Sequence, residues 1–322
     1  MTTNLLEVQG LKVVYRGKAS ETKALDNAWL SIPPDGYTLG VVGESGSGKS
    51  TLGLSIMNAI EPPGGIVGGK IDFAGRNVLK MSSSELRSYR WKEVSMVFQA
   101  AMNSLNPVKP VINPITEVIR QHTDASRDEA HETALALLSD VGINPNRSNN
   151  YPHEFSGGMR QRVVIALALA LSPRLLIADE PTSALDVVVQ QQILQLLKTM
   201  IAKKNLSLIF ITHEIALLNN ICDNVAVMYA GEIVEVGPTQ KVLSKPLHPY
   251  TEMLIGTIIR MGSNLQSLGG TVAYDSKSRG LLPESACKYS DRCKYAFGRC
   301  KVERPALREV ERGRWVACHK YN

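Results

Sequence analysis

The chain has 322 residues, of which 44% are hydrophobic and 20% are charged, and its formal net charge at pH 7 is +6. This composition is typical of a globular protein with room for about two domains, and it excludes a disordered, collagen-like or coiled-coil chain. The longest apolar run, Val163–Leu171, is far shorter than the about 20 residues that a membrane-spanning helix needs. The N-terminus has no signal-peptide pattern, so we expect a cytosolic protein.

Helices and strands are predicted to alternate along the first 240 residues. Apolar patterns predict strands over residues 5–15, 37–42, 94–99, 174–178 and 207–212, and a hairpin from 225–229 and 232–236. Helical spacing predicts helices over residues 50–59, 126–141, 158–171 and 187–203, with Ser126 as an N-cap and Gly142 ending the second. Proline and glycine predict loops at 61–69 and 107–114. The alternation predicts an α/β fold with a parallel sheet.

Basic residues and cysteines gather at the C-terminus. The segment Leu281–Asn322 contains ten Lys/Arg and five Asp/Glu. This charge indicates a solvated basic tail, or contact with an anionic partner, a membrane surface or an anionic cluster. Four of the five cysteines lie in the last 36 residues, and in a cytosolic protein such a group binds metal more often than it forms disulfides. Cys222 stands apart and is expected to be a buried small hydrophobe.

A glycine-rich string follows the strand predicted at 37–42 and precedes a predicted helix. It fits the pattern G-x-x-x-x-G-K-[ST] of a phosphate-binding loop. Its glycines let backbone N–H groups point at phosphate oxygens, and the helix N-terminus adds partial positive charge. The lysine reaches the β- and γ-phosphates and the final serine can ligate Mg²⁺. The string consists of Gly43, Glu44, Ser45, Gly46, Ser47, Gly48, Lys49 and Ser50.

A second motif is an apolar strand that ends in two carboxylates, Leu175–Glu180. Asp179 is placed to join the Mg²⁺ shell. Glu180 follows it at the strand tip, where a carboxylate can orient and deprotonate an attacking water. Next to a phosphate-binding loop, this pair predicts nucleotide hydrolysis.

A third string opens the helix predicted at 158–171. Ser156, Gly157 and Gly158 form a second anion site of the same physical type, and because one chain needs only one cradle, we expect a head-to-tail dimer. This string resembles the signature motif of the ABC-type ATPases. The resemblance covers residues 5–254. It implies a parallel sheet with an antiparallel N-terminal β region and a helical subdomain at about 100–160. The expected domains are therefore residues 1–255, a linker at 256–286 and a Cys-rich domain at 287–322.

The resemblance also implies roles for single residues. Tyr15 matches the aromatic residue that stacks on adenine, and Thr51 extends the nucleotide-binding loop. Gln99 matches the glutamine that contacts Mg²⁺ and water and faces the membrane partner. Asp186 matches an aspartate that touches the other subunit, and His213 matches the histidine that holds the γ-phosphate.

Within this family, the strings at 151–162 and 247–251 are similar to those of ATP-binding subunits of oligopeptide and dipeptide importers. This similarity implies ATP-driven import, with peptide, oligosaccharide or nickel as the solute. The implied partners are two membrane permease subunits, a second ATP-binding subunit and, indirectly, an extracytoplasmic solute-binding protein. The implied location is the cytoplasmic side of the membrane, peripherally bound.

The cysteine spacing is that of neither a zinc ribbon nor a ferredoxin. Four thiolates can hold either Zn²⁺ or a [4Fe–4S] cluster, and similar C-termini in peptide-importer ATPases favour the cluster. Zinc and the absence of a metal stay open. The residues concerned are Cys287, Cys293, Cys300 and Cys318.

Two other functions are compatible with parts of the sequence. A soluble ABC ATPase acting on nucleic acid would suit the basic C-terminus, although few aromatic residues are interleaved there. A redox-sensing regulatory ATPase would suit the cysteines. We expect the transport ATPase, without nucleic acid as a partner.

Overall fold

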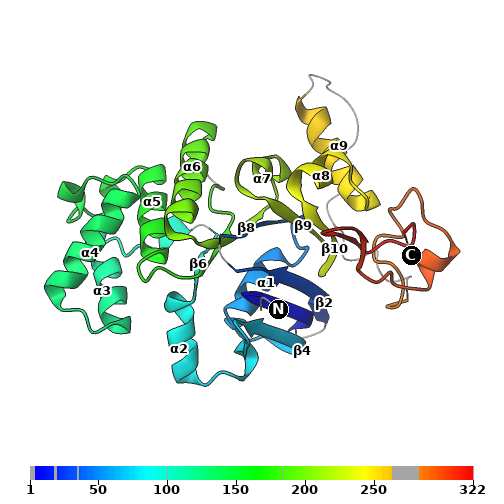
Figure 1. Ribbon diagram of the computed structural model, residues 1–322, viewed down its shortest axis with the longest axis horizontal. Helices are drawn as coiled ribbons and strands as arrows, with labels where there is room; N and C mark the ends of the chain where they lie inside the picture. The colour runs from blue at the N-terminus through cyan, green and yellow to red at the C-terminus, as the bar shows by residue number, and fades with distance from the viewer. Residues whose placement is uncertain are drawn as a thin grey trace. The chain divides into compact units, whose positions relative to one another are not determined.

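The computed structural model describes residues 4–17, 20–34, 36–99, 101–183, 185–262 and 283–321. Its contacts divide the chain into two compact units, and Figure 1 shows the helices and strands of both. Unit 1 contains residues 33–38 and 77–211. Unit 2 contains residues 4–32, 39–76 and 212–322. No helix of the described residues is long and apolar enough to cross a bilayer.

The core of unit 1 is a parallel sheet in the order β8, β7, β6, and every residue of these strands is buried. Burial on both faces explains why the strands are continuously apolar rather than alternating. Their predicted positions are confirmed. The bounds are β6 Val94–Val97, β7 Leu175–Asp179 and β8 Ser207–Thr212.

Along the chain of unit 1, helices precede and follow these strands, and α3, α4 and α5 contact one another (Figure 1). Ser126 caps α4 as expected, with Glu129 completing a capping box. The loop predicted at 107–114 is too long, because α3 already begins at Ile112 and accommodates Pro114 in its first turn. The bounds are α2 Ser83–Lys92, α3 Ile112–His122, α4 Arg127–Asp140, α5 Gly157–Ala168 and α6 Val187–Lys204, with short 3-10 helices at Val78–Lys80, Ala101–Ser104, Pro145–Arg147 and Pro152–Glu154.

Unit 2 contains an antiparallel sheet in the order β2, β1, β4, β5, which confirms the expected antiparallel N-terminal region. The loop predicted at 61–69 is wrong, since most of it belongs to β4. Its glycines serve the pairing instead of breaking it: a Cβ at Gly64 would lie 2.7 Å from Tyr15, and Gly69, with φ +92°, lies beside a bulge of β1. The bounds are β1 Leu6–Arg16, β2 Glu21–Ile32, β4 Gly64–Phe73 and β5 Arg76–Asn77.

A second set of strands in unit 2 runs in the order β11, β12, β10, β9, β3. The hairpin of β9 and β10 was predicted, and the C-terminal strand β12 extends it by pairing with β10. The helix α9 runs into the first residues of the expected linker, most of which lies outside the described residues. The bounds are β3 Thr38–Val42, α1 Lys49–Ile56, α7 Ile215–Ile221, β9 Asn224–Tyr229, β10 Glu232–Pro238, α8 Thr239–Ser244, α9 Pro249–Gly262, β11 Arg308–Glu311 and β12 Arg314–Val316, with a 3-10 helix at Gly298–Lys301.

Candidate functional site

The loop between β3 and α1 owes its shape to three glycines. Gly46 and Gly48 have φ values of +78° and +101°, and Gly48 is the N-cap of α1. A Cβ on Gly43 would collide with the carbonyl oxygen of Met228 in β9. The chain therefore curls tightly over the N-terminus of α1, where the backbone N–H groups of the first helical turn and the helix dipole favour an anion.

Lys49 places its ammonium group beside this loop. Its side chain is buried, and Nζ donates to the carbonyl oxygens of Gly43 at 2.8 Å and Glu44 at 3.0 Å. A turn within the loop is closed by the Ser47 N–H, which donates to the Glu44 carbonyl at 3.1 Å. Ser45, Gly46 and Ser50 are exposed, whereas Thr51 is half-buried. The loop thus combines a positioned ammonium group, that of Lys49, with exposed residues that a phosphate can reach.

We expect Gly43→Ala to weaken nucleotide binding by at least about tenfold, because the added methyl group has no space beneath the loop and must displace it. Titration with a fluorescent ATP analogue measures the change. Gly65→Ala is the matched control, since Gly65 lies in β4 of the same unit and nothing lies within 4 Å of a Cβ there. An unchanged affinity in Gly43→Ala would contradict the assigned loop geometry.

Two more predicted residues lie in unit 2. Tyr15 is half-buried near the end of β1, opposite Gly64 of β4 in the antiparallel register. His213 directly follows β8 and is exposed. Each is accessible enough to contact a ligand.

In unit 1 the two predicted carboxylates lie at the end of β7. Asp179 is its last residue and is 3% exposed. Glu180 has the left-handed φ of +47°, and its N–H donates to the Ile211 carbonyl at 2.9 Å. Gln99, after β6, donates from Nε2 to Glu180 Oε2 at 3.1 Å. The structure therefore brings Gln99 and Glu180 together, although 81 residues separate them.

The serine–glycine–glycine string also lies in unit 1. Ser156 is the N-cap of α5, and its Oγ accepts from the Met159 N–H at 3.4 Å. A Cβ on Gly158 would collide with Val189 of α6, so glycine is required where these helices approach. Asp186 caps α6 and accepts from the Val189 N–H at 3.0 Å. These two helix starts are consequently packed against each other.

The four C-terminal cysteines line one cavity of unit 2, together with Ser290 and His319. They are free cysteines, and burial raises the pKa of Cys287 to about 11 and raises those of Cys293 and Cys318. Among the described residues, no group of three or more His, Cys, Asp or Glu could hold a metal ion. The described residues therefore do not show the expected metal or iron–sulfur site, although the four thiols gather in one cavity as expected. Cys222 is buried, as predicted.

The basic charge of the C-terminal segment is largely neutralised within the unit. Most of its cations form ion pairs, which leaves less charge for an anionic partner or a membrane surface than the sequence suggests. Surface pairs contribute little stability, but those with buried partners fix geometry. The pairs are Lys288 with Asp26 and Glu232, Arg292 with Glu44, Lys294 with Glu252, Arg299 with Glu303, Arg304 with Asp26 and Glu232, and Arg314 with Glu235.

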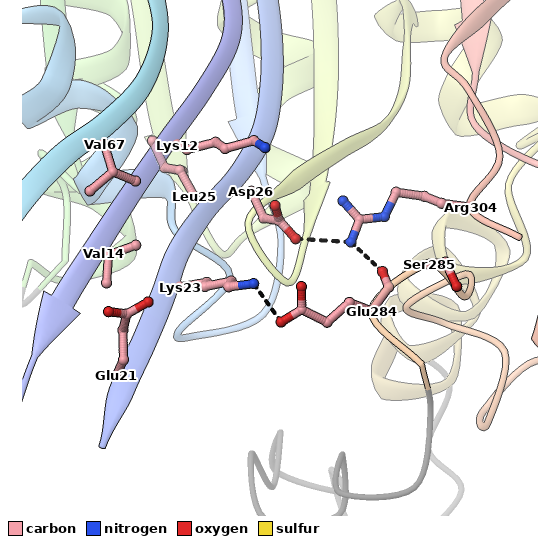
Figure 2. A pocket seen from close by; sticks show the side chains of 10 residues that line it. All are labelled: Lys12, Val14, Glu21, Lys23, Leu25, Asp26, Val67, Glu284, Ser285 and Arg304. Carbon is pink, nitrogen blue, oxygen red and sulfur yellow. Dashed lines mark hydrogen bonds and ion pairs between the residues drawn. The ribbon is translucent and has the colours of Figure 1, made fainter. Parts of the chain in front are cut away.

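An open hollow between β2 and the C-terminal segment shows the same pairing (Figure 2). Along its wall, Lys23 binds Glu284 at 2.6 Å and Arg304 binds Asp26 at 3.0 Å. Burial raises the pKa of Asp26, but hydrogen bonds and charge from Lys288 and Arg304 outweigh it and lower this pKa to about 2. The lining charges thus serve the contact between the two segments.

Comparisons with known proteins show which class of protein the chain belongs to. The family model "ABC transporter" matches residues 25–183, and the model "Oligopeptide/dipeptide transporter, C-terminal region" matches residues 234–300. A dimeric ATP-binding cassette, solved in a post-hydrolysis state with ADP and phosphate, is 26% identical with a TM-score of 0.65, covering 73% of this chain and 98% of that one. The chain therefore has the ABC cassette fold and is an ATPase of that class.

Relatives identify the family more closely. The probable peptide ABC transporter ATP-binding protein y4tR of Sinorhizobium fredii is 42% identical to this chain, and the match covers 99% of this chain and 95% of that protein. The dipeptide transport ATP-binding protein DppD of Escherichia coli is 40% identical, covering 98% and 96%. The oligopeptide transport ATP-binding protein OppD of Bacillus subtilis is 46% identical, covering 81% and 74%. The chain belongs to the family of ATP-binding subunits of oligopeptide/dipeptide ABC transporters.

Proposed function

We propose that this chain hydrolyses ATP to power the import of dipeptides or oligopeptides through a membrane ABC transporter. The observation that carries the proposal is the glycine-shaped loop at the start of α1, with Lys49 held beside it, in a chain that matches peptide-transport relatives over nearly its whole length. The proposed partners are two permease subunits, on whose cytoplasmic side the chain binds, and a second ATP-binding subunit. A solute-binding protein acts with them indirectly.

Nucleotide binding is assigned to both units. In unit 2, the loop from Gly43 to Thr51 binds the phosphates through backbone N–H groups other than those of Glu44 and Ser47, which donate to Tyr250 Oη and to the Glu44 carbonyl. Lys49 neutralises the phosphates and Tyr15 stacks on adenine. Mg²⁺ prefers oxygen ligands, and each residue proposed to ligate it carries one: the hydroxyl of Ser50 in unit 2, and the carboxylate of Asp179 and the side-chain carbonyl of Gln99 in unit 1. When bound, Mg²⁺ neutralises the charge of the β- and γ-phosphates.

The hydrolytic step is assigned to Glu180. Its carboxylate accepts a proton from the attacking water, and the hydrogen bond from Gln99 fixes its orientation. His213 donates a hydrogen bond to the γ-phosphate. The products are ADP and inorganic phosphate.

We further propose a head-to-tail arrangement of two ATP-binding subunits. The N–H groups at Ser156, Gly157 and Gly158 then contact the nucleotide held by the partner, and Asp186 touches that subunit. The support from unit 1 is that the helices these residues cap are packed on each other through Gly158. Closure and reopening of the pair transmit the hydrolysis cycle to the permeases.

A [4Fe–4S] cluster held by Cys287, Cys293, Cys300 and Cys318 is also proposed, with Zn²⁺ as the alternative. The support is that four free thiols line one cavity. The buried Ser290 Oγ and His319 Nδ1 line the same cavity and have no hydrogen-bond partner among the described residues. A [4Fe–4S] cluster is held by four cysteine thiolates, which matches the number of thiols that line this cavity. Such a cluster would cross-link the C-terminal segment.

The transport proposal is tested in membrane vesicles that contain the assembled transporter and its solute-binding protein. We expect uptake of a radiolabelled dipeptide to require ATP and to be lost in Lys49→Ala, because the cation beside the phosphates is removed. Lys80→Ala is the control, since Lys80 lies in a 3-10 helix remote in sequence from the loop. ATP-independent uptake, or full uptake in Lys49→Ala, would refute the proposal.

The cluster proposal is tested on chain purified without oxygen. We expect about four iron and about four sulfide per chain, with visible absorption that the variant Cys300→Ser lowers. One zinc per chain would favour the alternative. Neither metal would refute both.

A further inference from the structure

The phosphate-binding loop of unit 2 is held by the C-terminal segment at one carboxylate. Arg292 binds Glu44, the second residue of the loop, through two parallel hydrogen bonds of 3.0 Å. The pair is partly buried, with side-chain exposures of 31% for Arg292 and 22% for Glu44. The main chain of Glu44 is held as well, because its N–H donates to Tyr250 Oη at 2.8 Å. Glu44 is thus fixed at both ends by residues from beyond position 249.

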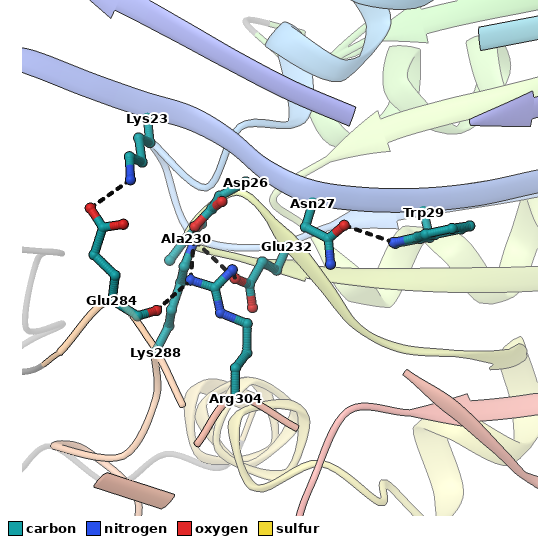
Figure 3. Close-up of polar contacts among 9 residues, drawn as sticks. All are labelled: Lys23, Asp26, Asn27, Trp29, Ala230, Glu232, Glu284, Lys288 and Arg304. Atoms are coloured by element: carbon teal, nitrogen blue, oxygen red, sulfur yellow. Dashed lines mark hydrogen bonds and ion pairs between the residues drawn. The ribbon is translucent and has the colours of Figure 1, made fainter. Parts of the chain in front are cut away.

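The turn between β9 and β10 makes a second contact with the loop. The Gly231 N–H, in the turn between β9 and β10, donates to the Ser47 carbonyl at 2.8 Å. Lys288 fixes that turn by donating from Nζ to the Ala230 carbonyl at 2.9 Å. Figure 3 shows Lys288 and Arg304 between Asp26 and Glu232, two carboxylates that are largely buried. Cations of the C-terminal segment therefore hold the turn that contacts the loop.

Lys288 and Arg292 are each adjacent in sequence to a cysteine that lines the cavity of the four C-terminal thiols. Lys288 follows Cys287, and Arg292 precedes Cys293. The same short segment consequently lines the thiol cavity and contacts the phosphate-binding loop. Nothing in the local sequence pattern signals this contact, because 248 residues separate Glu44 from Arg292.

The charge of Glu44 gives this contact a consequence for ligand binding. A carboxylate in a loop that binds phosphate repels the anionic ligand unless a cation neutralises it. Arg292 neutralises Glu44 and, through its planar fork, also fixes the direction of that side chain. Without the guanidinium group, the Glu44 carboxylate would repel the phosphates and its side chain would no longer be fixed in direction.

We propose that Arg292 is a positioning residue of the phosphate-binding loop, through which the C-terminal cysteine segment sets the affinity for nucleotide. This inference rests on the proposed function, namely that the loop binds ATP. Arg292 acts through Glu44 and does not itself contact the phosphates. Lys288 supports the same loop through the turn at Ala230.

The test is a double-mutant cycle on the full-length chain, read as the Kd of a fluorescent ATP analogue with Mg²⁺. We expect Arg292→Met to raise Kd about three- to tenfold, and Arg292→Met combined with Glu44→Gln to be no worse than Arg292→Met alone, since coupled residues are not additive. Arg292→Lys is expected to retain part of the affinity, because it keeps the charge and loses the fork. Salt should reduce the effect of Arg292→Met.

Arg299→Met is the matched control. Arg299 lies in the same segment and pairs with Glu303, also in that segment, at 2.7 Å. Its Kd should equal that of the unaltered chain. The midpoint of thermal unfolding is measured for each variant, because a general loss of folding would lower it in every variant with weakened binding. If Arg292→Met does not fold, Arg292→Lys replaces it in the comparison.

The outcomes separate this inference from the function beneath it. If the unaltered chain binds no ATP analogue, the proposed function fails. If it binds ATP but Arg292→Met and Glu44→Gln leave Kd unchanged, or their effects simply add, the positioning role is overturned.

Discussion

Replacing Glu180 by glutamine is expected to lower ATP turnover by about 10²–10⁴-fold while ATP binding persists. Glutamine has the same size and can still accept the hydrogen bond from Gln99 Nε2, but its amide cannot take a proton from water. The backbone of residue 180 is held in its left-handed conformation by the bond to the Ile211 carbonyl, which the substitution leaves in place. Phosphate release by the assembled transporter measures turnover.

Glu132→Gln provides the control for this substitution, because Glu132 is an exposed residue of α4 in the same unit. Its turnover and binding should match those of the unaltered protein. Turnover that persists in Glu180→Gln at more than about half the normal rate would remove Glu180 from the role of general base. A parallel loss of ATP binding would show instead that the substitution disturbs the site as a whole.

Replacing Arg314 by methionine is expected to destabilise the pairing of β12 with β10 by about 3–5 kcal/mol. Arg314 is 2% exposed at its side chain and binds Glu235, which is fully buried, at 3.0 Å. Glu235 also accepts hydrogen bonds from the N–H groups of Leu247 and His248, between α8 and α9. The substitution therefore leaves the buried carboxylate of Glu235 without its cation. Hydrogen exchange of the amides in β10 and β12 measures the local free energy of opening.

The matched control is Arg312→Met, which removes an exposed arginine two residues away and should change the exchange by less than about 0.5 kcal/mol. Combining Arg314→Met with Glu235→Gln should restore part of the stability, because a neutral amide tolerates burial better than a carboxylate. If Arg314→Met exchanges as slowly as the unaltered chain, this buried pair does not secure the C-terminal strand.

The sequence predicts the interior strands well because burial on both faces leaves an unbroken apolar run. The strands β6, β7 and β8 are of this kind, whereas the helix α4 was predicted from its helical spacing and its N-cap Ser126. Strand β4 was predicted as a loop, because Gly64 and Gly69 look like breakers until β1 is seen to approach them closely. Strand β2 was not predicted, because Lys23, Asp26 and Asn27, which are residue types depleted in strands, interrupt the apolar alternation of its first half.

The candidate site divides in the same way. The phosphate-binding loop, Asp179 and Glu180 are local strings whose chemistry can be inferred from spacing. The bonds that Arg292 and Tyr250 make to Glu44 join residues more than 200 positions apart, and no local pattern encodes such a pair. The gathering of the four cysteines was predicted from their proximity in the chain, whereas the metal they would hold stays a proposal.

The unit that carries the phosphate-binding loop is built from both ends of the chain, residues 4–32, 39–76 and 212–322. Arg304 meets Asp26 across 278 residues. At a synthesis rate of about 5–20 residues per second, Asp26 in β2 is synthesised roughly 14–56 s before Arg304. Residues 77–211 of unit 1 are continuous and can fold earlier. Translation therefore completes the surroundings of Glu44 last, and a chain released before residue 292 carries the loop without the arginine that neutralises it.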